Sequence, residues 1–366
     1  MALYVDIQKR LGDFVLRAKF ETDGGVTGIL GASGCGKSMT LRCIAGVARP
    51  DAGRIELDGE VLFDSEKKID QKPQKRQVGL LFQNYALFPN MTVRQNLMAG
   101  LRAREKDRGK AASQADEMLE RFRLTGLEHH RPHQLSGGQQ QRTALARILL
   151  SNPRMLLLDE PFSALDGYLK WNLELELSKV LREYGGNTLF VSHSRDEIYR
   201  LCDHACVMDH GTTGPVISVK KLFESPVSKA AALLSGCKNY SRARQTGPEE
   251  VFAEDWGIPL VYEGEAPDGF RHVGVRSHYL HPVSGEEARH CTNAFCCTLY
   301  QTVEDVFSMV LMVCPSGAGE QLREVAFEDL LRVEVTKEFW EEFCRQEDPK
   351  KEIWIHVEPR DVMLLE

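Results

Sequence analysis

The sequence predicts an α/β domain with a largely parallel sheet, followed by a smaller β-rich domain. Short apolar runs alternate with helical segments up to about residue 212, which is the order of a parallel α/β sheet. Beyond that point Gly and Pro become frequent, and short β-rich runs replace the helices. The 366 residues suffice for about two domains.

The first domain is expected at 1–212. Its beginning alternates loosely between apolar and polar residues and predicts an antiparallel strand pair. A helical subdomain is expected at about 84–153. Further strands are expected at 26–30, 78–82, 155–158 and 188–191.

The second domain is expected at 241–366, after a linker at 213–240. Its β-rich runs are 272–275, 296–300, 309–313 and 353–357. They predict a small all-β, barrel-like fold.

Composition excludes several classes of protein. A net charge of −7 argues against a nucleic-acid binder with a broad basic surface. No apolar run approaches the roughly 20 residues that cross a bilayer, and the N-terminus shows no signal segment. Ten cysteines at scattered spacings fit a reducing compartment. We therefore expect a cytosolic protein that reaches a membrane only through a partner.

A glycine-rich loop between a strand and a helix carries the first chemical signal. Glycines in such a loop let backbone N–H groups converge on a phosphate at a helix N-terminus, and the lysine adds a charge for the β- and γ-phosphates. The final hydroxyl suits Mg²⁺. The predicted ATP-binding residues are Gly31, Ala32, Ser33, Gly34, Cys35, Gly36, Lys37 and Ser38.

Polar residues follow the next strands. Asp159 ends an apolar strand and suits a Mg²⁺ shell, and Glu160 beside it suits an attacking water. His193 follows another strand, where it would contact the γ-phosphate and hold Glu160. Gln83 offers an amide oxygen to Mg²⁺ and water. The predicted catalytic residues are therefore Glu160, His193 and Gln83, with Ser38, Gln83 and Asp159 as Mg²⁺ ligands.

A second glycine-containing helix start lies at Ser136, Gly137, Gly138 and Gln139. It is another anion-binding terminus, although the chain already has a phosphate loop. We expect it to contact ATP held by a second copy of the chain in a C₂ homodimer.

These elements, in this order, resemble the ATPase subunits of ABC transporters. The resemblance covers residues 1 to about 210 and implies the ABC ATPase form of the P-loop NTPase fold. It also implies a D-loop at Ser163–Asp166, with Asp166 as its candidate site residue, and an aromatic side chain that stacks on adenine. Phe14 is the expected aromatic, with Tyr4 as the alternative.

Within that family, segments 61–69, 73–79, 235–239 and 273–276 resemble importers of oxyanions, molybdate first and then sulfate or tungstate. Importers of polyamines, iron or sugars share the architecture and remain the alternative. The resemblance implies a separate membrane permease and, indirectly, an extracytoplasmic solute-binding protein.

The same resemblance implies two further surfaces. The expected permease-docking residues are Tyr85, Leu87 and Phe88, although a buried core turn would also explain an apolar run there. The tail resembles a small regulatory β-barrel, in which Ser235, Lys238 and Asn239 would sense the anion. A dimer-stabilising appendage is the other interpretation of the tail.

Other classes fit less well. ABC ATPases of DNA repair or chromosome organisation carry a long coiled coil, whereas Lys37 to Ser136 shows no sustained heptads. Translation factors of this type need two sets of motifs in one chain. A binding module without turnover would not need Glu160 and His193, and exporters often fuse membrane helices to the ATPase.

Overall fold

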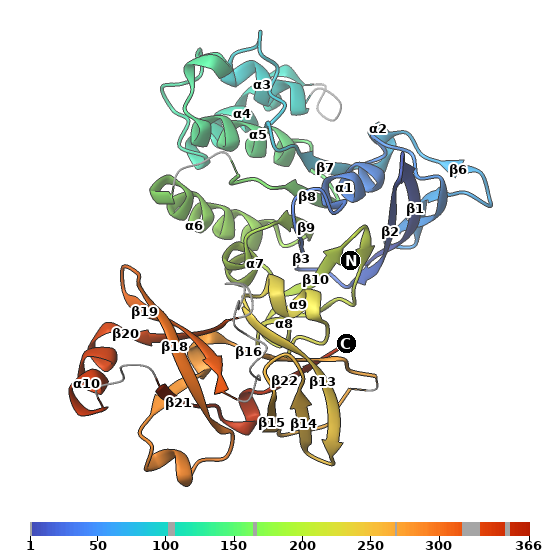
Figure 1. The fold of residues 1–366 in the computed structure, drawn as a ribbon. Helices are drawn as coiled ribbons and strands as arrows, with labels where there is room; N and C mark the ends of the chain where they lie inside the picture. Colours follow the sequence, from blue (N-terminus) through green and yellow to red (C-terminus); the bar gives the residue numbers. More distant parts are fainter. Residues whose placement is uncertain (1, 102–106, 164–166, 268, 317–329, 348–351) are drawn as a thin grey trace. The chain divides into compact units, whose positions relative to one another are not determined.

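The structure, a computed structural model, describes residues 2–101, 107–163, 167–267, 269–316, 330–347 and 352–366. Two compact units divide the chain, Met1–Lys220 and Lys221–Glu366 (Figure 1).

The first unit has twelve strands and seven helices among its described residues. The strands are β1 Leu3–Leu11, β2 Phe14–Thr22, β3 Val26–Leu30, β4 Ala52–Leu57, β5 Glu60–Asp64, β6 Ile69–Asp70, β7 Val78–Leu81, β8 Met155–Asp159, β9 Asn187–Ser192, β10 His204–Asp209, β11 Thr212–Thr213 and β12 Ile217–Ser218. The helices are α1 Lys37–Ala45, α2 Pro73–Arg76, α3 Val93–Leu101, α4 Arg108–Arg121, α5 Gly137–Leu150, α6 Gly167–Tyr184 and α7 Arg195–Leu201.

The sheet of this unit is mixed. Strands β10, β3, β9, β8 and β7 lie side by side and parallel, whereas β6, β5, β4, β1 and β2 form an antiparallel half. The parallel strands β8 and β9 are buried at every residue, as expected for strands covered on both faces. The expected largely parallel sheet is therefore correct for one half only, because the antiparallel half is built from hairpins that need no crossover helix.

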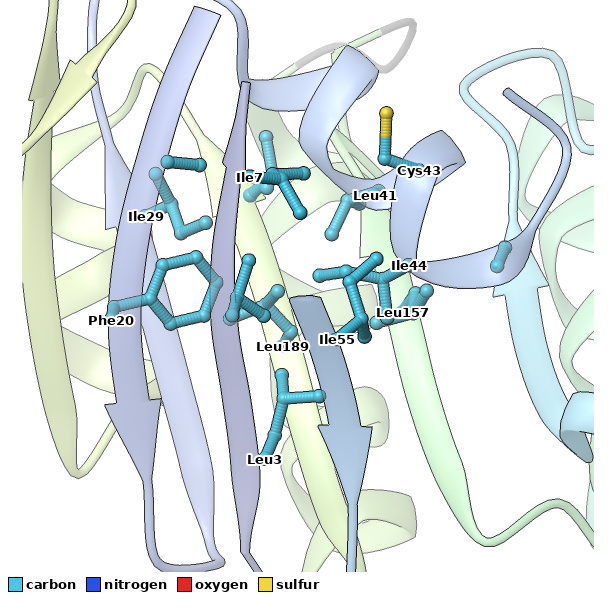
Figure 2. Close-up of a cluster of buried hydrophobic side chains, with 14 of the residues drawn as sticks. Leu3, Ile7, Phe20, Ile29, Leu41, Cys43, Ile44, Ile55, Leu157 and Leu189 are labelled. Carbon is cyan, nitrogen blue, oxygen red and sulfur yellow. The ribbon is translucent and has the colours of Figure 1, made fainter. Parts of the chain in front are cut away.

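One core joins the two halves. Leu3 and Ile7 of β1 and Phe20 of β2 belong to the same buried cluster as Ile29, Leu157 and Leu189 of the parallel strands. Leu41 and Ile44 of α1 pack into it as well (Figure 2). The helix that follows the glycine loop is thereby anchored on the sheet.

Three helices, α3, α4 and α5, contact one another and gather away from β1 to β6 (Figure 1). They fall within the segment 84–153 that was expected to form a helical subdomain.

Among its described residues, the second unit has ten strands. They are β13 Asn239–Gly247, β14 Glu250–Ala253, β15 Ile258–Val261, β16 His272–Val275, β17 His281–Val283, β18 Ala294–Glu304, β19 Ser308–Pro315, β20 Leu331–Thr336, β21 Glu352–His356 and β22 Met363–Leu365. They form two five-stranded sheets, ordered β15-β14-β13-β16-β22 and β17-β21-β18-β19-β20, around one shared core. The expected β-rich C-terminal fold is confirmed, with one addition: helix α10 Lys337–Glu347 packs Trp340 and Phe343 on this core.

Two asparagine side chains hydrogen-bond the backbone of edge strands in these sheets. The Asn239 amide bonds both the N–H and the C=O of Arg332 on edge strand β20, at 2.7 and 2.9 Å. The Asn293 amide does the same at Val261 on edge strand β15, at 2.7 and 2.8 Å. Edge backbone groups that would otherwise lack partners are thereby satisfied.

The segment 213–240, expected as a linker, is ordered. It contains β12, which pairs with β10, and helices α8 Val219–Glu224 and α9 Lys229–Leu234. Leu222 and Ala232 are buried there. Gly and Pro in this stretch lie between short elements, and the division between the two compact units falls within it, after Lys220.

Candidate functional site

The glycine loop links the end of β3 to the start of α1, and its glycines are sterically required. A Cβ on Gly31 would lie 2.5 Å from the Met208 carbonyl oxygen, and Gly36 has a φ of 113°. The first backbone N–H groups of α1 have no partner within the helix. The loop therefore presents a helix N-terminus suited to phosphate.

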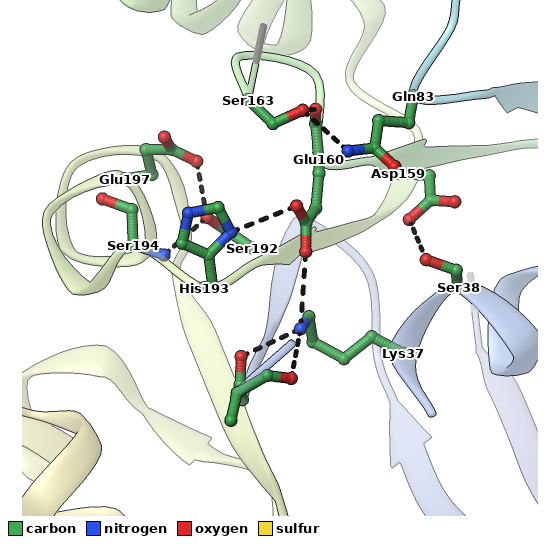
Figure 3. A network of polar contacts seen from close by, with 12 residues as sticks. Lys37, Ser38, Gln83, Asp159, Glu160, Ser163, Ser192, His193, Ser194 and Glu197 are labelled. Carbon is green, nitrogen blue, oxygen red and sulfur yellow. Dashed lines mark hydrogen bonds and ion pairs between the residues drawn. The ribbon is translucent and has the colours of Figure 1, made fainter. Parts of the chain in front are cut away.

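Lys37 is folded across this loop and is almost fully buried, with 3% of its surface exposed. Its Nζ donates to the carbonyl oxygens of Gly31 and Ala32, both at 2.9 Å, and lies 3.4 Å from Glu160 Oε1 (Figure 3). A buried ammonium needs such partners. The same charge is positioned for phosphates entering the loop.

Ser38 and Asp159 come together at the ends of α1 and β8. The Ser38 hydroxyl donates to Asp159 Oδ1 at 2.7 Å. Burial raises the pKa of the Asp159 carboxyl, and the Ser38 hydrogen bond opposes that rise. A hydroxyl and a carboxylate at this distance are hard oxygen donors, so the pair fits a Mg²⁺ ion.

Glu160 occupies the centre of the cluster. Its φ is 43°, a left-handed conformation that is strained for a residue with a side chain. Its N–H bonds the Val191 carbonyl at 3.0 Å, and its carboxylate lies between Lys37 and His193. His193 Nδ1 donates to Glu160 Oε2 at 3.1 Å, while the ring remains half exposed (Figure 3).

Gln83 reaches the same centre indirectly. Its Nε2 donates to Ser163 Oγ at 3.1 Å, and that hydroxyl donates to the Glu160 carbonyl oxygen at 3.0 Å. The structure thus brings Lys37, Ser38, Asp159, Glu160 and His193 into direct contacts, and Gln83 joins them through Ser163, a residue that the sequence analysis did not assign to catalysis.

The two candidate aromatics for adenine lie at opposite ends of β1 and β2. Phe14 pairs with Leu11 at the hairpin, and a Cβ on Gly36 would lie 3.4 Å from its Cζ. Tyr4 pairs with Glu21 at the far end. Only Phe14 borders the glycine loop.

The second glycine element caps α5. Ser136 Oγ accepts from the Gln139 N–H at 3.4 Å, and Gln139 Oε1 accepts from the Ser136 N–H at 2.9 Å. This reciprocal capping box orders the helix start with Gly137 and Gly138 in its first turn. Asp166, expected in the D-loop, lies outside the described residues.

Two predicted surfaces need correction. Tyr85 is 5% exposed and its hydroxyl donates to the Pro161 carbonyl at 3.4 Å, so its ring belongs to the core and not to a docking surface. Leu87 is half-buried and Phe88 is 46% exposed.

Two of the three residues predicted to sense the anion have internal hydrogen-bond partners in this structure. Ser235 is buried, where its hydroxyl donates to the Ala232 carbonyl and accepts from Arg276. Asn239 is buried, and its side-chain amide hydrogen-bonds the backbone N–H and C=O of Arg332. Lys238 is exposed. The side-chain donors of Ser235 and Asn239 are therefore engaged within the fold.

The sequence analysis did not assign a role to Glu197 or to Lys170. Glu197 bonds Ser192 beside His193 and pairs with Lys170 of α6. The only signal in the sequence is an acidic residue four positions after a candidate histidine, which is common at helix starts.

Comparisons with known proteins agree with this geometry. The profile of a family described as "ABC transporter" matches residues 20–163. The chain is 41% identical to a spermidine/putrescine import ATP-binding protein, PotA of Chromobacterium violaceum, over 62% of this chain and 62% of that protein. It is 39% identical to the molybdenum import ATP-binding protein ModC of Paramagnetospirillum magneticum, over 59% of this chain and 60% of that protein.

It is also 39% identical to the sulfate/thiosulfate import ATP-binding protein CysA of Thermosynechococcus vestitus, over 65% of this chain and 70% of that protein. Among solved structures, the dimeric ATP-binding cassette MJ0796 bound to ADP and Pi superposes with a TM-score of 0.51 at 26% identity. That superposition covers 60% of this chain and 99% of the cassette.

In the parts of the chain that the structure describes, no helix is long and apolar enough to cross a membrane. The phosphate loop, the strand-end carboxylates and the family match over the same residues lead to one conclusion: the chain belongs to the ATP-binding proteins of the ABC transporter family.

Proposed function

We propose that this protein is the ATP-hydrolysing subunit of an ABC importer, which turns over MgATP to energise solute uptake through a separate permease. The observation that carries the proposal is the Lys37–Glu160–His193 network beside the Ser38–Asp159 pair. Phosphate-binding, metal-binding and water-activating groups thus meet at one helix N-terminus. The importer function is supported by the similarity to ATP-binding proteins of polyamine, molybdenum and sulfate/thiosulfate import.

The residues divide the chemistry among them. The loop N–H groups and Lys37 hold the β- and γ-phosphates. Ser38 Oγ, Asp159 and the Gln83 amide oxygen hold Mg²⁺, which supplies charge neutralisation at the phosphates when bound. Phe14 stacks on adenine beside Gly36.

Glu160 then orients and polarises the attacking water, since ATP phosphates draw Lys37 away from its carboxylate. His193 fixes that carboxylate through the 3.1 Å hydrogen bond and faces the γ-phosphate. The strained φ of Glu160 aims its side chain at this position and away from the strand.

The nucleotide is shared between two copies of the chain. The capped start of α5, Ser136 to Gln139, contacts the ATP held in the loop of the second copy, and Asp166 belongs to the same interface. The dimeric form of the MJ0796 cassette supports this arrangement. The subunit sits at the cytoplasmic face of the membrane, held by the permease.

Phe88 is the docking residue for the permease. It follows β7 and Gln83 and presents an exposed ring, with the Arg147 guanidinium 5.2 Å from its centroid. An exposed aromatic that closely follows Gln83 in the chain suits a short helix of a partner. Leu87 contributes the half-buried rim.

Phe88→Glu should therefore abolish solute uptake in cells while the purified chain keeps its ATPase activity. Tyr85→Glu serves as the contrasting variant, because a carboxylate at that buried position should lower the unfolding temperature instead. Uptake at the wild-type level in Phe88→Glu would remove Phe88 from the docking surface.

The transported solute is an oxyanion, with molybdate the first candidate and sulfate or tungstate next. Matches to ModC and CysA, both at 39% identity, support this class, and the match to PotA at 41% identity supports polyamine as the second candidate. An extracytoplasmic binding protein would deliver the solute to the permease.

Deleting the gene and measuring uptake of molybdate, sulfate and spermidine separates these solutes. Loss of oxyanion uptake alone, restored by the wild-type gene but not by one encoding Glu160→Gln, is the expected result. Loss of spermidine uptake alone would favour the polyamine alternative. Unchanged uptake of all three solutes would contradict both assignments.

A further inference from the structure

We propose that Glu197, acting with Lys170, is a positioning residue that holds the turn carrying His193 and links this turn to the start of α6. The inference rests on the proposed ATPase function. Among the contacts of the described residues, Glu197 reaches the candidate site through Ser192, the residue before His193, and the proposed effect acts through the position of His193.

Glu197 is a buried carboxylate with both oxygens engaged. It lies in the first turn of α7, with 3% of its surface exposed. Its Oε2 accepts from Ser192 Oγ at 2.6 Å, and its Oε1 forms an ion pair with Lys170 Nζ. Because an unpaired buried carboxylate is costly, both contacts must form together in the folded chain.

The Ser192 contact fixes the backbone on both sides of His193. Ser192 ends β9, and its hydroxyl also accepts from the Ser194 N–H at 2.9 Å. The Ser192 carbonyl accepts from the Gly31 N–H at 3.4 Å, at the beginning of the phosphate loop. Figure 3 shows the Glu197–Ser192 contact and the His193–Glu160 contact together in one close-up.

His193 needs this support because its own packing is slight. Half of its side chain is exposed, and the Glu160 carboxylate is its partner at 3.1 Å. The orientation of the ring is therefore set largely by the turn that carries it. A displacement of about 1 Å at a catalytic group is enough to lower a rate by roughly 100-fold.

Lys170 extends the link to a second helix. It lies in the first turn of α6, which begins directly after the D-loop segment. A shift of the start of α6 would pull on Glu197 and so on the Ser192–Ser194 turn. The geometry thus couples the D-loop end of α6 to the position of His193.

A second ion pair between the same helices provides a matched control. Glu174, four residues after Lys170 on α6, is 2% exposed and accepts from Arg200 of α7 at 2.7 and 2.8 Å. This pair joins α6 to α7 with the charges reversed, and no hydrogen bond between the pair and Ser192 is found among the described residues. Loss of either pair weakens the packing of the two helices, and only loss of Glu197 frees the His193 turn.

The test compares Glu197→Ala, Ser192→Ala and Glu174→Ala in the full chain, with steady-state ATPase, nucleotide affinity and unfolding temperature as readouts. We expect kcat to fall roughly 10- to 100-fold in the first two variants, with ATP affinity within about twofold of the wild type. Glu174→Ala should lower the unfolding temperature but keep kcat within about twofold. Ser192→Ala leaves the Lys170–Glu197 pair intact and so tests the link even where Glu197→Ala folds poorly.

Combination with His193→Ala distinguishes positioning from general damage. If Ser192 acts through His193, Ser192→Ala should add less than about twofold to the loss already caused by His193→Ala. Three outcomes would each overturn the inference. The first is that the losses of kcat in Ser192→Ala and His193→Ala multiply in the double variant. The others are an unchanged kcat in Ser192→Ala and Glu197→Ala, or an equal loss of kcat in Glu174→Ala. A folded wild-type chain without ATPase activity would instead overturn the proposed function.

Discussion

Glu160→Gln should bind ATP as the wild type does and turn it over at least about 100-fold more slowly. Glutamine keeps the size of the side chain and its reach to His193 and Lys37, but it lacks the charge that polarises water, and general-base catalysis typically contributes about 10²–10⁴-fold. Phosphate release under saturating ATP measures the loss, and binding of ATP to the purified chain measures what is retained. The ATP-bound dimer should accumulate as a result.

Glu60→Gln is a suitable control, since Glu60 is an exposed carboxylate on β5 that pairs with Arg154 away from the site. It should turn over ATP at the wild-type rate. Turnover of Glu160→Gln at that same rate would remove Glu160 from the hydrolytic step.

Lys37→Ala should lose nucleotide binding itself. The Lys37 ammonium is buried against the loop and donates to the Gly31 carbonyl, and the hydrogen bonds that it would make to bound phosphate oxygens are charge-assisted. Such bonds contribute about 1.5–3 kcal/mol each, so the loss of two should weaken ATP affinity by about 100-fold or more. Equilibrium binding of ATP, with the unfolding temperature measured in parallel, checks this. Wild-type affinity in a folded Lys37→Ala chain would contradict the assignment of the loop.

The same variant tests whether each ATP is shared between copies. A mixed dimer of Lys37→Ala and Gly137→Asp chains keeps one composite site in which the loop of one copy and the α5 start of the other are both intact. Such mixtures should recover turnover that neither variant shows alone. Failure to recover any turnover at ratios that do form mixed dimers would argue for two independent sites.

The central cluster could be predicted from the sequence because it depends on local rules. Asp159 and His193 each follow an apolar run, and parallel strands bring such ends to one edge of a sheet, where the structure places both. The sequence pattern of the glycine loop predicts that a helix begins directly after it. The direct Lys37–Glu160 contact and the left-handed backbone of Glu160 have no such local signature.

The failures of sequence reasoning concern contacts between distant residues. Asn239 looks like a free donor in the sequence, but the fold brings its side chain to Arg332 of β20, 93 positions away, whose backbone takes up the whole amide. Tyr85 looks like part of an exposed apolar run until its hydroxyl is found on Pro161. Glu197 carries no motif, because its role depends on where α6 and α7 pack.

Phosphate release from ATP by the purified full-length chain, followed over a range of chain concentrations with and without Mg²⁺, tests the central claim most directly. The proposed mechanism predicts hydrolysis that requires Mg²⁺, rises in rate per chain as copies associate, and disappears in Glu160→Gln. A folded chain that binds MgATP yet releases no phosphate at any concentration, or one whose hydrolysis survives Glu160→Gln unchanged, would contradict it.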